Sequence, residues 1–123
     1  MRVLLRLLIN AAALWVATQT VPGISFSGDW RLLLLVALVF GVLNVLVRPI
    51  LIILTFPFLL LTLGLFTLVL NAFMLWLTSV LSETLGLGFY VRDFWAAFFG
   101  ALVVSLVSFA LSVFLASERK AEH

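Results

Sequence analysis

Residues 50–81 read ILIILTFPFLLLTLGLFTLVLNAFMLWLTSVL, a run of 32 residues without a charged side chain. A bilayer has a hydrocarbon core about 30 Å thick, which an α-helix crosses with roughly 20 apolar residues. The run is therefore too long for one crossing and too short for two crossings joined by a turn. Pro57 divides it, because a proline inside a helix removes one hydrogen bond and clashes with the preceding turn. We predict a membrane helix at residues 59–81, preceded by an apolar connector at 49–58.

Three paths remain open for this connector. It extends the preceding helix, lies at the membrane interface, or re-enters the membrane from the side on which it begins. The sequence does not distinguish them.

The composition excludes a soluble domain. Of 123 residues, 66% are hydrophobic and 10% are charged, and the mean hydropathy is +1.37. Soluble domains are about 45–50% apolar and about 25% charged, and a chain this short cannot bury so much apolar surface. The sequence has no cysteine, and its single histidine is the terminal His123. We therefore expect no enzyme and no nucleic-acid partner, and we assign no catalytic, cofactor-binding or metal-ligating residues.

Polar and turn-forming residues divide the chain into four crossings within a single transmembrane domain, residues 1–123. We expect these helices at about 3–21, 31–48, 59–81 and 94–116. Basic residues near the helix ends give the direction. Five of them share the side of the N-terminus (Arg2, Arg6, Arg48, Arg119 and Lys120), and only Arg31 and Arg92 share the other. This imbalance predicts that both termini are cytoplasmic.

An internal duplication is the second organising feature. Asn10-Ala11-x-x-Leu14-Trp15 recurs as Asn71-Ala72-x-x-Leu75-Trp76 after 61 residues, and Gly23-Ile24 recurs as Gly88-Phe89 after 65 residues. The alternative is coincidence in an apolar sequence. A true repeat predicts two tandem helical hairpins, at about 3–47 and 62–116, related by a pseudo-two-fold axis along the membrane normal.

Five polar residues fall within or at the ends of the expected crossings: Arg6, Asn10, Asn44, Arg48 and Asn71. In hydrocarbon such groups require a protein partner or a wet cavity. In one interpretation the asparagines bond helix to helix and the arginines extend to the interface. In the other, the five form a cationic pocket for an anionic lipid headgroup or an anion path.

Small residues recur at helical spacing in two of the expected helices: Ala37 and Gly41, then Ala97, Gly100, Ala101, Ser105, Ser108 and Ser112. Such residues let helices approach closely. They predict close packing inside one chain, a seam between copies of the chain, or a weakly polar pore lining formed by the serines.

The centre of the chain resembles a known family. The pattern Asn44-x-x-x-Arg48-Pro49-Ile50-Leu51, followed by Pro57, by Leu61-Thr62-Leu63-Gly64-Leu65-Phe66 and by Asn71-Ala72, is similar to the four-helix phage holins of superfamily IV. The resemblance implies a bacterial inner-membrane protein with four helices that forms homo-oligomers and is capable of forming pores. It does not specify an activity, because members also occur as small uncharacterised membrane proteins of bacterial chromosomes.

Three functions follow as hypotheses. The first is a holin-like assembly of self-associating copies in the lipid bilayer. The second is a non-lytic structural or regulatory protein, for example in envelope stress, that binds anionic phospholipid or a partner through the region of Arg48. The third, a small transporter or anion channel, is disfavoured because no acidic residue that could couple a substrate lies in any expected crossing.

Overall fold

A computed structural model describes residues 2–122, with side chains described for 2–116. Within that range the chain forms five helices and two short strands. In order they are α1 (Arg2–Thr20), β1 (Ile24–Phe26), α2 (Trp30–Leu46), α3 (Arg48–Leu61), α4 (Phe66–Leu85), β2 (Phe89–Val91) and α5 (Phe94–Glu122). Arg119 and Lys120, which contribute to the predicted orientation, lie outside the described side chains.

Three helices are long and apolar enough to cross a membrane: Arg2–Thr20, Phe66–Leu85 and Phe94–Ala116. The 17 residues of α2 span about 25 Å, which is short of a hydrocarbon core. Only together with α3 is α2 long and apolar enough to cross a membrane, and the axes of the two helices are bent by 54° relative to each other. By length and composition, the described residues therefore provide three or, with the bent pair, four candidate crossings, and the predicted helical membrane protein is confirmed to that extent.

The region expected to be a connector is itself a helix. Pro57 lies inside α3 without ending it, so the expected break at this proline is not seen. The chain turns instead after Leu61, where Leu63 and Gly64 have positive φ angles of 56° and 90°. The next helix consequently begins at Phe66, later than the expected start at residue 59.

Two short strands, which the sequence did not reveal, join the loop between α1 and α2 to the loop between α4 and α5. β1 and β2 pair in an antiparallel register, Ile24 with Val91, Ser25 with Tyr90 and Phe26 with Phe89. We call this pair the β ribbon. Each strand is preceded by a glycine with a positive φ angle, which side chains disfavour: 94° at Gly23 and 88° at Gly88.

The β ribbon continues past its strands through backbone hydrogen bonds. Arg92 N donates to Gly23 O at 2.7 Å, and Ser27 N donates to Gly88 O at 3.1 Å. The ribbon thus ties the loop between α1 and α2 to the loop between α4 and α5.

Aspartates start the two helices that leave the β ribbon. The Asp29 carboxylate accepts from the backbone N–H groups of Arg31 and Leu32 and caps α2. The Asp93 carboxylate accepts from Ala96 N at 2.9 Å in the first turn of α5. This hydrogen bond lowers the pKa of the exposed Asp93 carboxyl below its usual value. Asp29 and Asp93 therefore fix the first turns of α2 and α5 next to the β ribbon. We call this side of the molecule the ribbon end.

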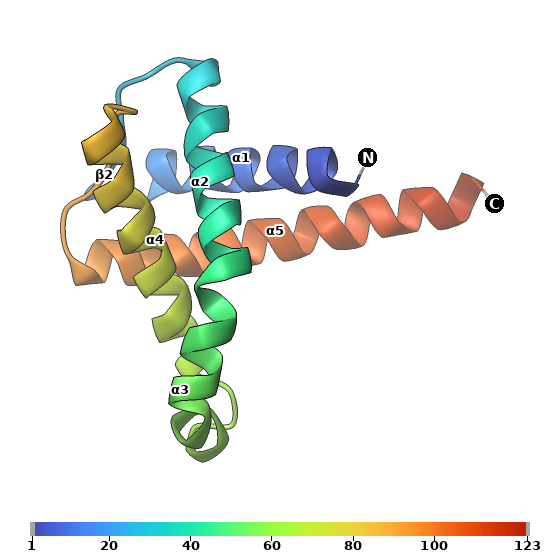
Figure 1. Ribbon diagram of the computed structural model, residues 1–123. Coiled ribbons are helices and arrows are strands. Elements are labelled where there is room, and N and C mark those ends of the chain that lie inside the picture. Colours follow the sequence, from blue (N-terminus) through green and yellow to red (C-terminus); the bar gives the residue numbers. More distant parts are fainter. Residues whose placement is uncertain (1, 123) are drawn as a thin grey trace.

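The buried apolar core lies in the middle of the helices and toward the β ribbon. It includes Ala13, Leu14 and Ala17 of α1; Val36, Ala37 and Phe40 of α2; Ala72, Met74 and Leu75 of α4; and Ala96, Ala97, Ala101 and Val104 of α5. The opposite ends are exposed, with 80% exposure at Val3 and 62% at Leu46, and α3 buries no residue. Figure 1 shows α1 and α5 side by side, α2 and α4 crossing them, and both chain ends away from β2.

We predict that Ser82→Ala destabilises the fold. The second strand directs two N–H groups at α4, where Ser82 Oγ accepts from Phe89 N and Ser79 Oγ accepts from Val91 N, each at 2.9 Å. Because these hydroxyls are buried, losing one leaves a donor unsatisfied, at a cost of about 1–3 kcal/mol. The measurement is the thermal unfolding midpoint in detergent. The control is Thr84→Ala, whose hydroxyl is exposed. An equal midpoint for Ser82→Ala and wild type would contradict the role of Ser82.

We predict that Gly100→Ala is destabilising by about 1–3 kcal/mol through overpacking. A Cβ atom at Gly100 would lie 2.2 Å from Ile24 Cδ1 and 2.8 Å from Leu75 Cδ2. Gly41→Ala is the matched control, since its Cβ would meet its nearest neighbour at 3.5 Å. The midpoint should fall for Gly100→Ala alone; equal midpoints for the two variants would show that α5 does not approach β1 and α4 this closely.

Candidate functional site

Two adjoining cavities lie where the helices cross. The first, the Arg48 cavity, has a volume of about 370 Å³ and is lined by Phe40, Asn44, Arg48, Asn71, Ala101, Val104, Ser105 and Ser108. The second, the α1–α2 cleft, has a volume of about 770 Å³ and is lined by residues of α1, α2 and α5. The two share Asn44 and Ser108. Both volumes fall in the usual range for ligand sites.

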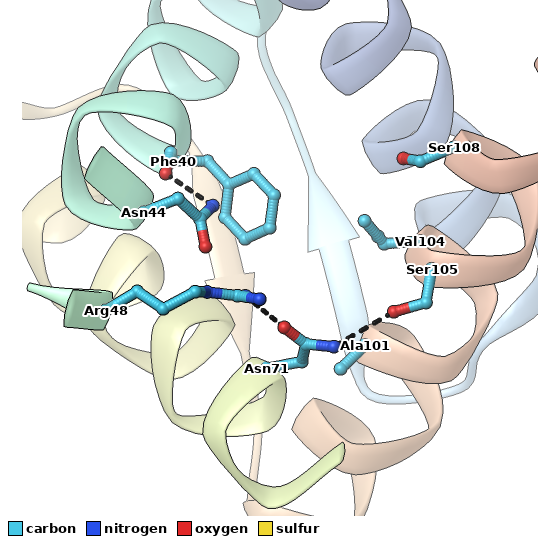
Figure 2. Close-up of a pocket in the computed structure, with 8 residues that line it drawn as sticks. All are labelled: Phe40, Asn44, Arg48, Asn71, Ala101, Val104, Ser105 and Ser108. Carbon is cyan, nitrogen blue, oxygen red and sulfur yellow. Dashed lines mark hydrogen bonds between the residues drawn. The ribbon is translucent and has the colours of Figure 1, made fainter. Parts of the chain in front are cut away.

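A chain of hydrogen bonds crosses the Arg48 cavity. Nη2 of Arg48 donates to Asn71 Oδ1, and Nδ2 of Asn71 donates to Ser105 Oγ at 3.1 Å. Figure 2 shows these three side chains in line across the cavity. The first residue of α3 is thereby connected through α4 to α5.

Two polar atoms of this cavity are buried without a protein partner. Nδ2 of Asn44 donates to Phe40 O at 2.8 Å, but Asn44 Oδ1 accepts nothing, and Arg48 Nε donates to nothing. In Figure 2 the Asn44 amide oxygen is directed toward the Arg48 side chain. Buried polar atoms are rarely left unpaired, because each costs about 1–3 kcal/mol. One is an acceptor and the other a donor, so a shift of the two side chains would let them satisfy each other, and a single group that offers both functions would satisfy both in place.

No acidic side chain balances Arg48 within the part of the chain whose side chains are described. The acidic residues there are Asp29, Glu83 and Asp93, at the helix ends next to the β ribbon. The ion pair found in this range joins exposed Arg92 to Asp93 at 3.3 Å. Among the side chains of residues 2–116, the half-buried Arg48 guanidinium is therefore a positive charge without a counter-ion.

The α1–α2 cleft holds the other two polar residues that the sequence singled out, Arg6 and Asn10. Arg6 is exposed and Asn10 half-buried. A Cβ atom at Gly41 would lie 3.5 Å from Asn10 Nδ2, so this asparagine faces a glycine. The five predicted residues thus divide between two adjoining sites: Asn44, Arg48 and Asn71 line the Arg48 cavity, while Arg6 and Asn10 line the cleft beside Asn44.

The predicted small-residue seam also divides. Ala37, Ala97, Gly100 and Ala101 are buried inside the chain, where they bring the helices close together. Gly41, Ser108 and Ser112 line the cleft instead. Ser105 and Ser108 line the Arg48 cavity, a polar role that sequence spacing did not indicate, because no motif links them to Asn71.

The fold and these cavities define a small polytopic helical membrane protein with a polar interior. Residues 1–110 match the family described as mycobacterial 4 TMS phage holin, superfamily IV, and the chain belongs to that family. The resemblance inferred from the central motif is therefore confirmed.

Two bacterial relatives are similar over most of their length. An uncharacterised protein of Streptomyces coelicolor, SCO3922, is 49% identical over 117 residues, covering 91% of this chain and 94% of the relative. The uncharacterised membrane protein YvlD of Bacillus subtilis is 33% identical over 100 residues, covering 81% of each. No solved structure matches the chain.

We predict that Gly41→Ser stabilises the fold, because the new hydroxyl would give Asn10 a partner like the one that Ser105 gives Asn71. Polar contacts between membrane helices contribute about 0.6 kcal/mol on average. The thermal unfolding midpoint should therefore be slightly higher for Gly41→Ser than for Gly41→Ala, which adds the carbon without the hydroxyl. A lower midpoint for the serine variant would show that Asn10 does not face this position.

Proposed function

We propose that this chain is a self-associating, holin-like protein of the bacterial cytoplasmic membrane, in which a second copy closes the α1–α2 cleft. The observation that supports this is a set of polar side chains in a cleft whose other walls are apolar. The polar side chains are Arg6, Asn10, Asn44, Ser108 and Ser112. Ser112 on α5 and Arg6 on α1 are exposed there. Hydrocarbon offers these groups no hydrogen bonds, whereas a second copy brings its own polar side chains and excludes lipid.

The small residues of the cleft favour a protein as its occupant. Gly41 on α2 and Ser108 and Ser112 on α5 line its walls. A helix of another copy can approach such positions closely, and close approach is a main source of stability for helix contacts in membranes. In an assembly of several copies, the same polar lining would face a shared lumen.

We also infer that the two hairpins are related by a pseudo-two-fold axis through the β ribbon. Exchanging each residue for the one 65 positions away turns the pair Ile24–Val91 into Phe26–Phe89 and leaves Ser25–Tyr90 unchanged. This exchange also interconverts the two hydrogen bonds that extend the ribbon, Arg92 N to Gly23 O and Ser27 N to Gly88 O. The register supports the predicted duplication.

The proposed orientation places the β ribbon outside and both chain ends in the cytoplasm. Figure 1 shows the N- and C-terminal ends on one side, away from β2. Arg2 and Arg6 lie in the first turns of α1, at that end, while the two basic residues of the ribbon end are Arg31 and Arg92. With Arg119 and Lys120 close to the end of the sequence, four basic residues belong to the chain ends and two to the ribbon end. This excess favours the cytoplasmic side for the chain ends.

A second candidate function is a non-lytic membrane protein that binds a ligand through the Arg48 cavity. The unpaired Arg48 Nε and Asn44 Oδ1 favour it. Dye-loaded liposomes that contain the purified chain distinguish the two candidate functions. Release of the dye supports a holin-like pore, whereas retention of the dye favours the non-lytic membrane protein.

Single cysteines test self-association, because the natural chain has none. We predict that Ser112→Cys forms a disulfide-linked dimer on oxidation in lipid, since this position lines the cleft. The control is Ala110→Cys, another small, exposed position of α5, two residues away and hence on the far side of the helix. Dimers should be several-fold more abundant for Ser112→Cys than for Ala110→Cys. Equal yields, or none, would contradict closure of the cleft by a second copy.

A further inference from the structure

We propose that the Arg48 cavity binds the headgroup of an anionic phospholipid that carries a hydroxyl group, of which phosphatidylglycerol is the simplest. In this structure Arg48 Nε and Asn44 Oδ1 are both covered by protein atoms. When the lipid binds, the two side chains move apart, a phosphate oxygen accepts from Nε, and the headgroup hydroxyl donates to Oδ1. This site is separate from the proposed seam between copies, so it can be tested whether or not the chain self-associates.

The guanidinium specifies the anionic part of the ligand. Arginine presents five N–H donors in a planar fork that matches phosphate oxygens. In this cavity Nη2 is engaged by Asn71, while Nε is buried and unpaired. Since the acidic residues with described side chains lie at the ribbon end, an anion from outside the chain supplies the missing negative charge.

The Asn44 amide specifies the rest of the headgroup. Its Nδ2 is occupied by Phe40 O, and its unpaired Oδ1 is an acceptor, which a bare anion would repel. The ligand must therefore bring a donor next to its anionic oxygen. A glycerol headgroup does this, because its hydroxyls lie a few bonds from the phosphodiester.

The helix that begins at Arg48 offers apolar surface for the acyl chains. α3 buries no residue, and its side chains Ile50 and Ile53 are 59% and 75% exposed. A headgroup in the Arg48 cavity can therefore leave its tails along α3 in the surrounding lipid, without entering the α1–α2 cleft.

The test measures lipid retained by the full-length chain in native mass spectrometry. Detergent-purified protein is mixed with equal amounts of phosphatidylglycerol and phosphatidylcholine, the latter having no net charge and no headgroup hydroxyl. The quantity compared is the ratio of phosphatidylglycerol to phosphatidylcholine retained per chain. We expect this ratio to exceed one for wild type and to be about tenfold lower for Arg48→Gln, the usual effect of losing a charge-assisted hydrogen bond. Arg31→Gln is the matched control: it makes the same charge change on an exposed side chain at the ribbon end and should retain the preference.

A second variant separates loss of binding from loss of folding. Asn44→Asp places a carboxylate beside Arg48 and so supplies the counter-ion from within the chain. We expect it to lose the preference for phosphatidylglycerol as Arg48→Gln does. The variant also loses the hydrogen bond from Asn44 Nδ2 to Phe40 O, which the new ion pair with Arg48 offsets, so its thermal unfolding midpoint should stay close to that of wild type. Undiminished preference in Asn44→Asp would overturn the proposed contacts.

Competition identifies the source of the phosphate. Glycerol 3-phosphate offers the same chemistry without acyl chains, and we expect it not to displace the lipid at equal concentration. Displacement would assign the cavity to a soluble phosphate and overturn the lipid assignment. Equal lipid preference in wild type and Arg48→Gln would overturn the site altogether and leave water as the partner of both unpaired atoms. Lipid is counted per chain, so none of these results depends on the oligomeric state.

Discussion

The antiparallel pairing of β1 with β2 is the interaction on which the arrangement of the helices depends. Only three residues of each strand pair, but they join loops that are more than sixty positions apart in the sequence. The buried hydroxyls of Ser79 and Ser82 hold the outer edge of β2 against α4. At this end α1 and α5 bury the alanines Ala17, Ala96 and Ala97, and α4 buries Thr78, Ser79 and Ser82. Away from it the helices expose apolar side chains to the membrane and leave the two polar cavities between them.

Hydropathy and charge predicted the membrane class because the bilayer sets the length of an apolar segment. The sequence pattern predicts a break at Pro57, but α3 continues through this proline. The third candidate crossing therefore begins at Phe66 and not at residue 59. The actual turn depends on the positive φ angles of Leu63 and Gly64, which apolar composition does not signal. The β ribbon was missed because two three-residue strands carry no periodicity of their own and form only by pairing with each other.

The candidate site was foreseen in its residues but not in its connections. Arginine and asparagine are conspicuous in an apolar sequence, so Asn44, Arg48 and Asn71 could be identified without a structure. Arg48 is linked through Asn71 to Ser105 by two hydrogen bonds. These bonds depend on how α3, α4 and α5 pack together, and residue spacing within one helix does not predict that packing. Both proposals, a second copy in the α1–α2 cleft and a lipid headgroup in the Arg48 cavity, have the same physical reason. Polar groups in hydrocarbon lack water and need hydrogen-bond partners.

The β1–β2 pairing can be tested directly by cross-linking Ser25 to Tyr90. These residues are paired and exposed, and paired strand positions lie within the Cα separation that a disulfide spans. The double variant Ser25→Cys/Tyr90→Cys, oxidised in membranes of intact cells, should form an intrachain disulfide that protects both thiols from a maleimide mass tag. The control pair Ser25→Cys/Glu83→Cys should remain tagged. Two freely tagged thiols in the paired variant would contradict the joining of the two hairpins.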